Sequence, residues 1–132
     1  MNKKIEVRTD ARDSLVDITD RVEEAVSESR VDAGLCVIYV PHTTAGVTIN
    51  ENADPSVRRD LLMALAQAVP DSLPYTHAEG NSPAHVKASL VGSSATVFIE
   101  DGRLRLGTWQ GIFLCEFDGP RRRQVLVKII SA

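Results

Sequence analysis

The sequence has no long hydrophobic run and no excess of basic residues. Its apolar stretches are far shorter than the roughly 20 residues that a membrane-spanning helix needs, so we expect no membrane segment. The formal net charge of -3 provides no basic field to collect phosphate backbones, which argues against nucleic acid as a partner. The first residues contain no apolar signal region, and the expected location is therefore the cytoplasm.

Cysteine and aromatic residues are scarce. Cys36 and Cys115 each lie inside an apolar, strand-like run, which is typical of buried, reduced thiols. They are too far apart in the sequence to resemble a metal knuckle, so we leave them out of the candidate site. Aromatic residues make up only 5% of the chain, and short strands leave sheet edges that need covering. Both features favour association of several copies.

What the sequence does have is enough length and apolar content for one domain. A chain of 132 residues with 43% hydrophobic content can bury a core without help from a disulfide or a metal. Strand-like runs at both ends of the chain flank helical patterns in the middle. We therefore predict a single compact α+β domain over residues 1–132, with a mixed, largely antiparallel sheet and helices concentrated mid-chain.

The strands are predicted from apolar alternation and from β-branched runs. They cover residues 3–8, 15–18, 35–40, 46–50, 96–99, 103–106, 112–117 and 124–130. The run 35–40 is apolar throughout, which is typical of a central strand buried on both faces. Asp101-Gly102 and Asp118-Gly-Pro120 predict the turns of two hairpins near the C-terminus.

Three segments show an N-cap acceptor followed by a second helix-start signal: Asp20 with Glu23, Asp54 with Pro55, and Ser82 with Pro83. The first predicted helix buries Val22, Ala25 and Val26. The second ends at Pro70 and carries one apolar face, made of Val57, Leu61, Ala64, Leu65 and Ala68. The third ends near Gly92.

All three histidines fall at the ends of predicted elements. His42 follows the apolar run 35–40, His77 lies in the loop before the third helix, and His85 lies in that helix's first turn. Side chains at element ends can converge on a cleft. The segment 75–85 also supplies Glu79 and Asn81, so polar groups are dense around the two later histidines.

Two or three neutral imidazoles are a natural ligand set for a divalent metal, with zinc as the first expectation and magnesium as the alternative. Three nitrogen ligands from His42, His77 and His85 leave one coordination position open, which is the catalytic pattern. Glu79 would then act as general base or as a fourth ligand. The alternative is that His42 caps a turn and His77 is solvated, because no H-x3-H or C-x2-C motif is present.

A second group of residues indicates anion binding. The start of the helix at Pro83 offers free backbone N–H groups, and Thr43 and Thr44 provide a polar loop that we place beside it. The cations that could contribute are Lys87, Arg103, Arg105 and the run Arg121-Arg-Arg123. Such an arginine run is more often a solvated face or an intersubunit contact than a phosphate clamp. Trp109, between two glycines, closes the core or stacks on a flat ring or a neighbouring subunit.

Three ordered motifs resemble one known family. They are Pro41-His-Thr-Thr-Ala-Gly46 with Asn50-Glu-Asn-Ala-Asp-Pro55, then His77-Ala-Glu-Gly-Asn81 with His85-Val-Lys-Ala-Ser-Leu90, and finally Leu106-Gly-Thr-Trp-Gln110 with Glu116-Phe-Asp-Gly-Pro-Arg121. Together they resemble the signatures of the YjbQ-like family, also described as secondary thiamine-phosphate synthase enzymes. The resemblance covers nearly the whole chain.

The resemblance implies a compact α+β fold, a homotrimer and a weak activity that joins a pyrimidine pyrophosphate to a thiazole phosphate. It leaves the family's main role open. It implies a shared metal or catalytic site at His42, His77 and His85. On this basis we expect catalytic roles for Glu79, His77 and Asn81. We expect contacts to a small phosphorylated substrate from Lys87, Thr43, Thr44 and Trp109.

Two other functions fit the same residues. One is a non-enzymatic protein that sequesters a metal or a small phosphorylated ligand. The other is a metal-dependent hydrolase, because an activated water needs the same three imidazoles. Turnover separates the first of these from an enzyme, since a binding protein shows saturable affinity and forms no product.

Overall fold

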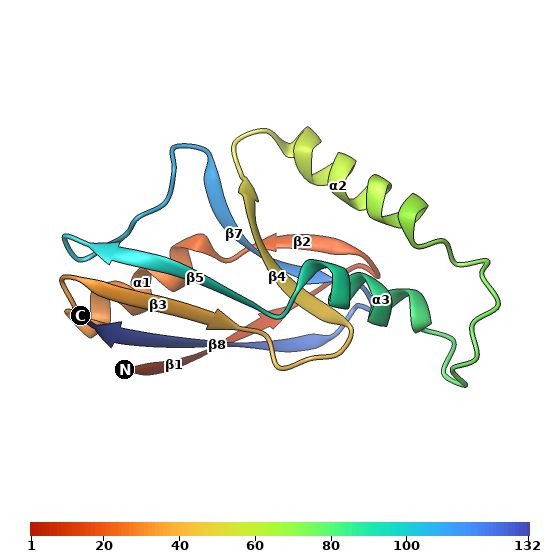
Figure 1. Cartoon of the computed structure of the whole chain (residues 1–132), viewed down its shortest axis with the longest axis horizontal. Coiled ribbons are helices and arrows are strands. Elements are labelled where there is room, and N and C mark those ends of the chain that lie inside the picture. Colours follow the sequence, from red (N-terminus) through yellow and green to blue (C-terminus); the bar gives the residue numbers. More distant parts are fainter.

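The computed structural model describes residues 1–132 as two antiparallel sheets and three helices (Figure 1). In chain order the elements are β1 (Asn2–Arg8), β2 (Ser14–Asp17), α1 (Thr19–Ser29), β3 (Gly34–Tyr39), β4 (Ala45–Glu51), α2 (Pro55–Ala68), α3 (Ser82–Val91), β5 (Ser94–Glu100), β6 (Arg103–Leu104), β7 (Gln110–Glu116) and β8 (Arg122–Ser131). The α+β class and the antiparallel pairing are confirmed. None of the helices is long and apolar enough to cross a membrane.

The strands form a five-stranded sheet in the order β1-β8-β3-β5-β6 and a three-stranded sheet in the order β2-β7-β4. A core cluster of 19 buried residues draws on both sheets and on α1. The period-two pattern of strands explains this, because alternate residues such as Val125, Val127 and Ile129 of β8 point to the same side. Helix α1 completes the core with Val22, Ala25 and Val26, as predicted.

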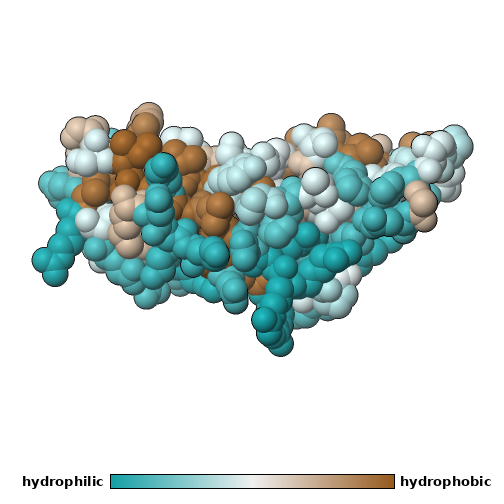
Figure 2. Space-filling model, turned by 90° about the horizontal axis from the view of Figure 1, so that it is seen from below, coloured by the Kyte–Doolittle hydropathy of each residue, from teal (hydrophilic) through white to brown (hydrophobic).

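Strand β3 is buried on one face only, which corrects the expectation of a strand buried on both faces. Cys36 and Ile38 are fully buried, whereas Leu35 is 36% exposed. Across the sheet Leu35 lies opposite Phe98 of β5 and Ile130 of β8, which are also exposed. Figure 2 shows apolar side chains gathered over the half of the molecule that holds this sheet. The helices and the second sheet cover only the inner side.

Two of the three predicted helix starts match the structure closely. Asp54 accepts a hydrogen bond from the Ser56 amide at 2.9 Å, and α2 begins at Pro55. Helix α3 begins at Ser82 with Pro83 in its first turn, and its N-cap is Asn81. The predicted cap at Asp20 is wrong, because the N-cap of α1 is Ile18, two residues earlier. Helix α1 starts at Thr19, so Asp20 lies inside the first turn, where a carboxylate still favours the helix dipole.

Helix α2 lies against the edge of the domain and is only lightly packed. None of its residues is fully buried, and in Figure 1 it projects from the body of the molecule. Leu61, Leu62 and Leu65 pack against a second core cluster that includes Phe113. Ala64 and Ala68, predicted on the apolar face, are exposed. The helix is therefore held by one row of leucines and by its cap.

Both cysteines are buried and unpaired, as expected from the sequence. Burial, with a smaller contribution from the charge of Glu23, raises the pKa of Cys36 to about 11. Burial raises the pKa of Cys115 to about 12. Neither thiol is a nucleophile near neutral pH, because the thiolate is the reactive form.

The two faces of β3 give a direct test of the packing. Ile38→Ala should lower the free energy of unfolding by about 2–5 kcal/mol, because it leaves a cavity in the core. Leu35→Ala, on the outer face of the same strand, should cost about 1 kcal/mol or less. Urea unfolding of both variants measures the difference. Equal costs would contradict the burial of β3 on one face only.

Candidate functional site

A polar cleft lies where three loops meet at one end of the two sheets. The loops are the β3–β4 connection, the segment before α3 and the β7–β8 turn. The cleft has a volume of about 460 Å³. All its lining residues except one proline are polar or charged: Pro41, His42, Thr43, Thr44, His77, Glu79, Asn81, His85, Asp118, Arg121 and Arg123. The three histidines, which are far apart in the sequence, therefore line the same cleft.

The close approach of β4 to the end of α3 brings these loops together. The amide of Val47 donates a 3.0 Å hydrogen bond to the carbonyl oxygen of Gly92. A Cβ atom on Gly46 would lie 2.5 Å from that oxygen, so the contact requires glycine at this position. Helix α3 therefore lies directly beside β4, and its first turn presents His85 to the loop that carries His42.

His42 takes the place of a missing strand partner. The last paired residues of β3 and β8 are Tyr39 and Leu126, and beyond them the Gln124 amide donates to His42 Nε2 at 2.9 Å. Burial and the nearby charge of Arg123 hold the pKa of His42 below its ordinary value. The ring is therefore neutral at neutral pH. Because Nε2 accepts a hydrogen bond, the proton is assigned to Nδ1.

His77 and His85 form a close pair at the rim of the cleft. Their ring centroids are 5.3 Å apart, and the rings meet edge to face at 83°. Glu79 Oε1 lies 3.9 Å from His77 Nε2, and the Glu79 side chain is 73% exposed. The pair and its carboxylate therefore belong to an open, solvated rim, in contrast to the more sheltered His42.

The donor set suits a metal only in part. No group of three or more His, Cys, Asp or Glu side chains is gathered in this arrangement into a metal-binding cluster. The His42 Nε2 lone pair is engaged by the Gln124 amide, so His42 could ligate through Nε2 only by giving up that bond. The paired imidazoles of His77 and His85, with Glu79 beside them, are the donors that remain free to share an ion.

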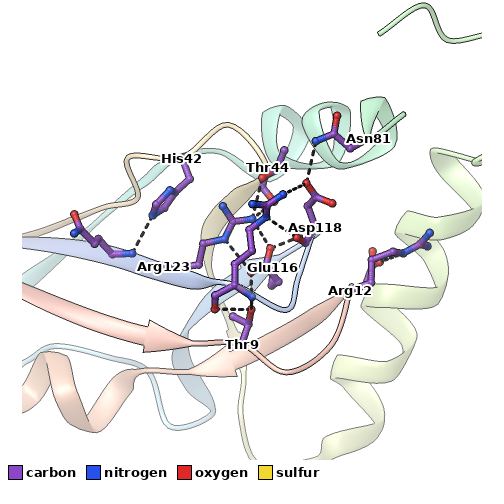
Figure 3. A network of polar contacts seen from close by, with 11 residues as sticks. Thr9, Arg12, His42, Thr44, Asn81, Glu116, Asp118 and Arg123 are labelled. Atoms are coloured by element: carbon purple, nitrogen blue, oxygen red, sulfur yellow. Dashed lines mark hydrogen bonds and ion pairs between the residues drawn. The ribbon is translucent and has the colours of Figure 1, made fainter. Parts of the chain in front are cut away.

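A buried ion pair forms the floor of the cleft (Figure 3). Glu116, at the end of β7, is fully buried and pairs with Arg123 of β8. Thr9 Oγ1 donates to Glu116 Oε1 at 2.7 Å, and the Asp118 amide donates to Oε2 at 3.0 Å. Burial opposes ionisation of Glu116. The hydrogen bonds from Arg123, Asp118 and Thr9 outweigh that effect and hold its pKa below the ordinary value.

Asn81 and Asp118 connect α3 to the β7–β8 turn. The Asn81 side-chain amide donates to Asp118 Oδ2 at 2.9 Å, and Arg121 binds the same oxygen at 3.0 Å. Burial opposes ionisation of Asp118. The hydrogen bonds from Asn81 and Arg121 outweigh that effect and keep its pKa below the ordinary value. The Asn81 Oδ1 atom is buried and has no hydrogen-bond partner. Asn81 thus has a structural contact and one spare acceptor beside the cleft.

The remaining candidates are divided between the cleft and other surroundings. Thr43 and Thr44 line the cleft, and Thr44 is held by Arg123. Lys87 is buried outside it, where its ammonium group donates to Asp13 Oδ2 at 2.8 Å. Trp109 is 62% exposed in the connection before β7 and does not line the cleft. The structure therefore does not bring Lys87 or Trp109 to the histidines of the same chain.

Sequence reasoning missed the residues of the floor. The sequence did not single out Thr9, Glu116 or Asp118 as site residues, although Glu116 and Asp118 lie in the third motif. It indicated Arg121 and Arg123 as possible anion contacts only as part of a basic run. One signal was available for Glu116, because it is the only charged residue within the apolar run 112–117. A charge in such a position is costly to bury unless it is paired, so it indicates a partner elsewhere in the fold.

The fold and the cleft define a class of small α+β proteins in which two antiparallel sheets support a polar cleft lined by histidines. The comparison with known protein families agrees with this class. The family model described as "UPF0047 protein YjbQ-like" matches residues 3–132. The chain belongs to this family, as its sequence motifs suggested.

Relatives match along almost their whole length. A UPF0047 protein of Methanocaldococcus jannaschii is 59% identical over 128 residues, which is 97% of this chain and 93% of the relative. The UPF0047 protein YugU of Bacillus subtilis is 49% identical over 132 residues, covering 99% of this chain and 100% of the relative.

Solved structures share the fold. A YjbQ/UPF0047 family protein from Clostridium acetobutylicum superposes with a TM-score of 0.95 at 55% identity, over 97% of this chain and 99% of the other. A YbjQ-like protein of unknown function from Sulfolobus solfataricus superposes with a TM-score of 0.96 at 36% identity, over 100% of this chain and 97% of the other. These relatives are uncharacterised, so the site itself must supply the argument about function.

The buried ion pair makes stability depend on pH. A carboxyl whose pKa is lowered by folding stabilises the protein above its unfolded value, about 4.3 for glutamate, and loses that contribution at lower pH. Glu116→Gln should therefore lower the free energy of unfolding by about 3–5 kcal/mol at neutral pH, because it leaves Arg123 without its counterion. The difference in free energy of unfolding between the parent and Glu116→Gln should therefore shrink as the pH falls through the folded pKa of Glu116.

Urea unfolding measures this difference in free energy for the parent and for Glu116→Gln. The measurements run from neutral pH to about pH 3, the range in which carboxyl groups titrate. A difference that stays constant over the range would show that folding does not lower the pKa of Glu116, because only a pKa difference between the folded and unfolded protein makes stability depend on pH.

Proposed function

We propose that the cleft binds a small phosphorylated molecule and acts on it as a weak transferase. The observation that carries the proposal is the joint presence of two arginines and three histidines in one polar cleft. Charged N–H donors are the preferred partners of phosphate oxygens, and guanidinium groups match their geometry. The volume of about 460 Å³ suits a small molecule.

The charge balance of the cleft supports a divalent metal as part of the proposal. Glu116 pairs with Arg123 and Asp118 pairs with Arg121, so both arginines are already balanced, and Glu79 adds a further negative charge. A phosphate dianion therefore needs added positive charge. Zinc, or magnesium as the alternative, would be held by His77 and His85 with Glu79 beside them, and by His42 if it released Gln124. When bound, the metal would supply positive charge that neutralises a pyrophosphate leaving group.

The reaction that we propose joins a pyrimidine pyrophosphate to a thiazole phosphate. Support comes from the three sequence motifs that resemble those of secondary thiamine-phosphate synthases, and from the cationic donors where a leaving pyrophosphate would need them. In this scheme the thiazole ring nitrogen attacks the carbon that carries the pyrophosphate, and the pyrophosphate leaves with the electrons of the broken C–O bond. Arg121 and Arg123 bind phosphate oxygens, and Asn81 and Thr43 orient the ligand. Glu79 acts as a base that takes up a pyrimidine proton and returns it, since the net reaction releases none. A metal-dependent hydrolase would use the same groups, with Glu79 acting on a bound water.

The outer face of the five-stranded sheet supports the proposal of a homotrimer. Leu35, Phe98 and Ile130 form an exposed apolar row that another copy could cover. Trp109, exposed and away from its own cleft, would be free to reach a neighbouring copy. Light scattering at micromolar concentration should return about three times the chain mass of 14.4 kDa, and a monomer mass would contradict the proposal.

One set of variants tests the metal and the base together. His77→Ala and His85→Ala should each lose most of the bound metal, because removing either imidazole leaves too few donors.

Glu79→Gln keeps the size of the side chain and removes its basicity. If Glu79 is the base, turnover should fall by about 10²–10⁴-fold while the metal content stays the same.

The assay is thiamine-phosphate formation, with elemental analysis and melting temperature measured on the same samples. Full activity of Glu79→Gln at unchanged metal content would remove Glu79 from the mechanism. Loss of both activity and metal would make it a ligand. Unchanged metal content in either histidine variant would refute the shared metal site. Saturable binding with no product would favour the binding protein.

A further inference from the structure

Arg123 combines two properties that rarely occur together. The residue is only 4% exposed, yet it lines the cleft. Its Nε donates to Glu116 Oε1 at 2.8 Å. Its Nη2 donates to Thr44 Oγ1 at 2.9 Å, to the Thr44 carbonyl oxygen at 3.2 Å and to Glu116 Oε2. The third nitrogen, Nη1, makes no hydrogen bond to the protein and is not among the buried atoms that lack a partner.

The partners of Arg123 are themselves fixed. Glu116 is fully buried and also accepts from Thr9 and from the Asp118 amide. The Thr44 carbonyl accepts in addition from the Phe117 amide at 3.2 Å, which anchors the β3–β4 loop to the end of β7. The guanidinium therefore cannot rotate without breaking several buried hydrogen bonds. A ligand that binds its free edge does not have to order it first.

Arg121 provides the contrast within the same cleft. Its side chain is bound only to Asp118, and half of its surface is exposed. Arg121 is therefore a half-exposed cation at the rim, whereas Arg123 is a buried donor on the floor. The charge of Arg123 is already neutralised by Glu116, so what it offers a ligand is directed N–H groups rather than net positive charge.

We infer that Arg123 is the fixed phosphate-binding group of the cleft, and that Glu116, Thr9 and Thr44 are the positioning residues that aim its free Nη1 edge at the ligand. This inference rests on the proposed function, since it names the contact that the small phosphorylated molecule makes. His42 lies in the same lining, and the Gln124 amide holds its ring in place through Nε2. The ligand class is a phosphoryl or pyrophosphoryl group.

The test compares two neighbouring arginines. Arg123→Lys keeps the charge and removes the planar fork, and Arg122→Lys makes the same change at an exposed residue outside the cleft. The probes are inorganic phosphate and pyrophosphate, titrated by calorimetry into the full-length protein. Arg123→Lys should weaken pyrophosphate binding by about ten- to hundredfold, the range for one hydrogen bond to a charged group. Arg122→Lys should bind like the parent.

Thr44→Val gives an independent reading if Arg123→Lys does not fold. It removes the 2.9 Å hydrogen bond that orients Nη2 and changes no charge. We expect a severalfold loss of pyrophosphate affinity with a normal near-UV circular dichroism spectrum. A folded Thr44→Val protein with unchanged affinity would overturn the inference.

The outcomes separate the inference from the proposed function. If the parent binds neither probe, the proposed function fails and the inference falls with it. If the parent binds pyrophosphate and a folded Arg123→Lys binds it equally well, the inference fails and the proposed function stands. Equal losses in Arg122→Lys and Arg123→Lys would show that the loss does not depend on the position of Arg123 in the cleft, and would also overturn the inference.

Discussion

The ion pair between Glu116 and Arg123 is the interaction on which the site depends, because it joins the two sheets. Glu116 ends β7 of the three-stranded sheet, and Arg123 lies near the start of β8 in the five-stranded sheet. Burying two charges is costly unless their remaining hydrogen-bonding groups are satisfied, and here Thr9, Thr44 and the Asp118 amide satisfy most of them. The pair also holds the β3–β4 loop, which carries His42.

The cleft therefore has a rigid floor and an open rim. The floor consists of buried side chains whose hydrogen bonds cross between sheets, as Figure 3 shows for Arg123, Glu116 and Thr44. The rim includes His77 and Glu79, which lie in the segment between α2 and α3 and have exposed side chains. Such a division suits a site in which the floor orients a ligand and the rim adapts to it, because fixed donors lose little entropy on binding.

Local signals in the sequence predicted most of the elements. Alternating apolar residues predicted the strands, and the cap before Pro55 predicted the start of α2, because both depend on neighbouring residues alone. The exposed face of β3 could not be predicted, since an apolar run does not say whether the chain itself covers both sides. The residues of the floor could not be predicted for a related reason. Glu116 meets Arg123 across a turn and Thr9 across more than a hundred residues, and neither contact leaves a local pattern.

The bond between His42 and the Gln124 amide has a consequence for how the site can be observed. The imidazole completes a hydrogen-bond ladder that β3 leaves unfinished, so its Nε2 serves either the backbone or a ligand, but not both at once. A ligand that takes Nε2 must free the Gln124 proton to solvent, whereas a ligand that meets Nδ1 leaves it protected. The exchange rate of a single backbone amide therefore reports which nitrogen of His42 is in use.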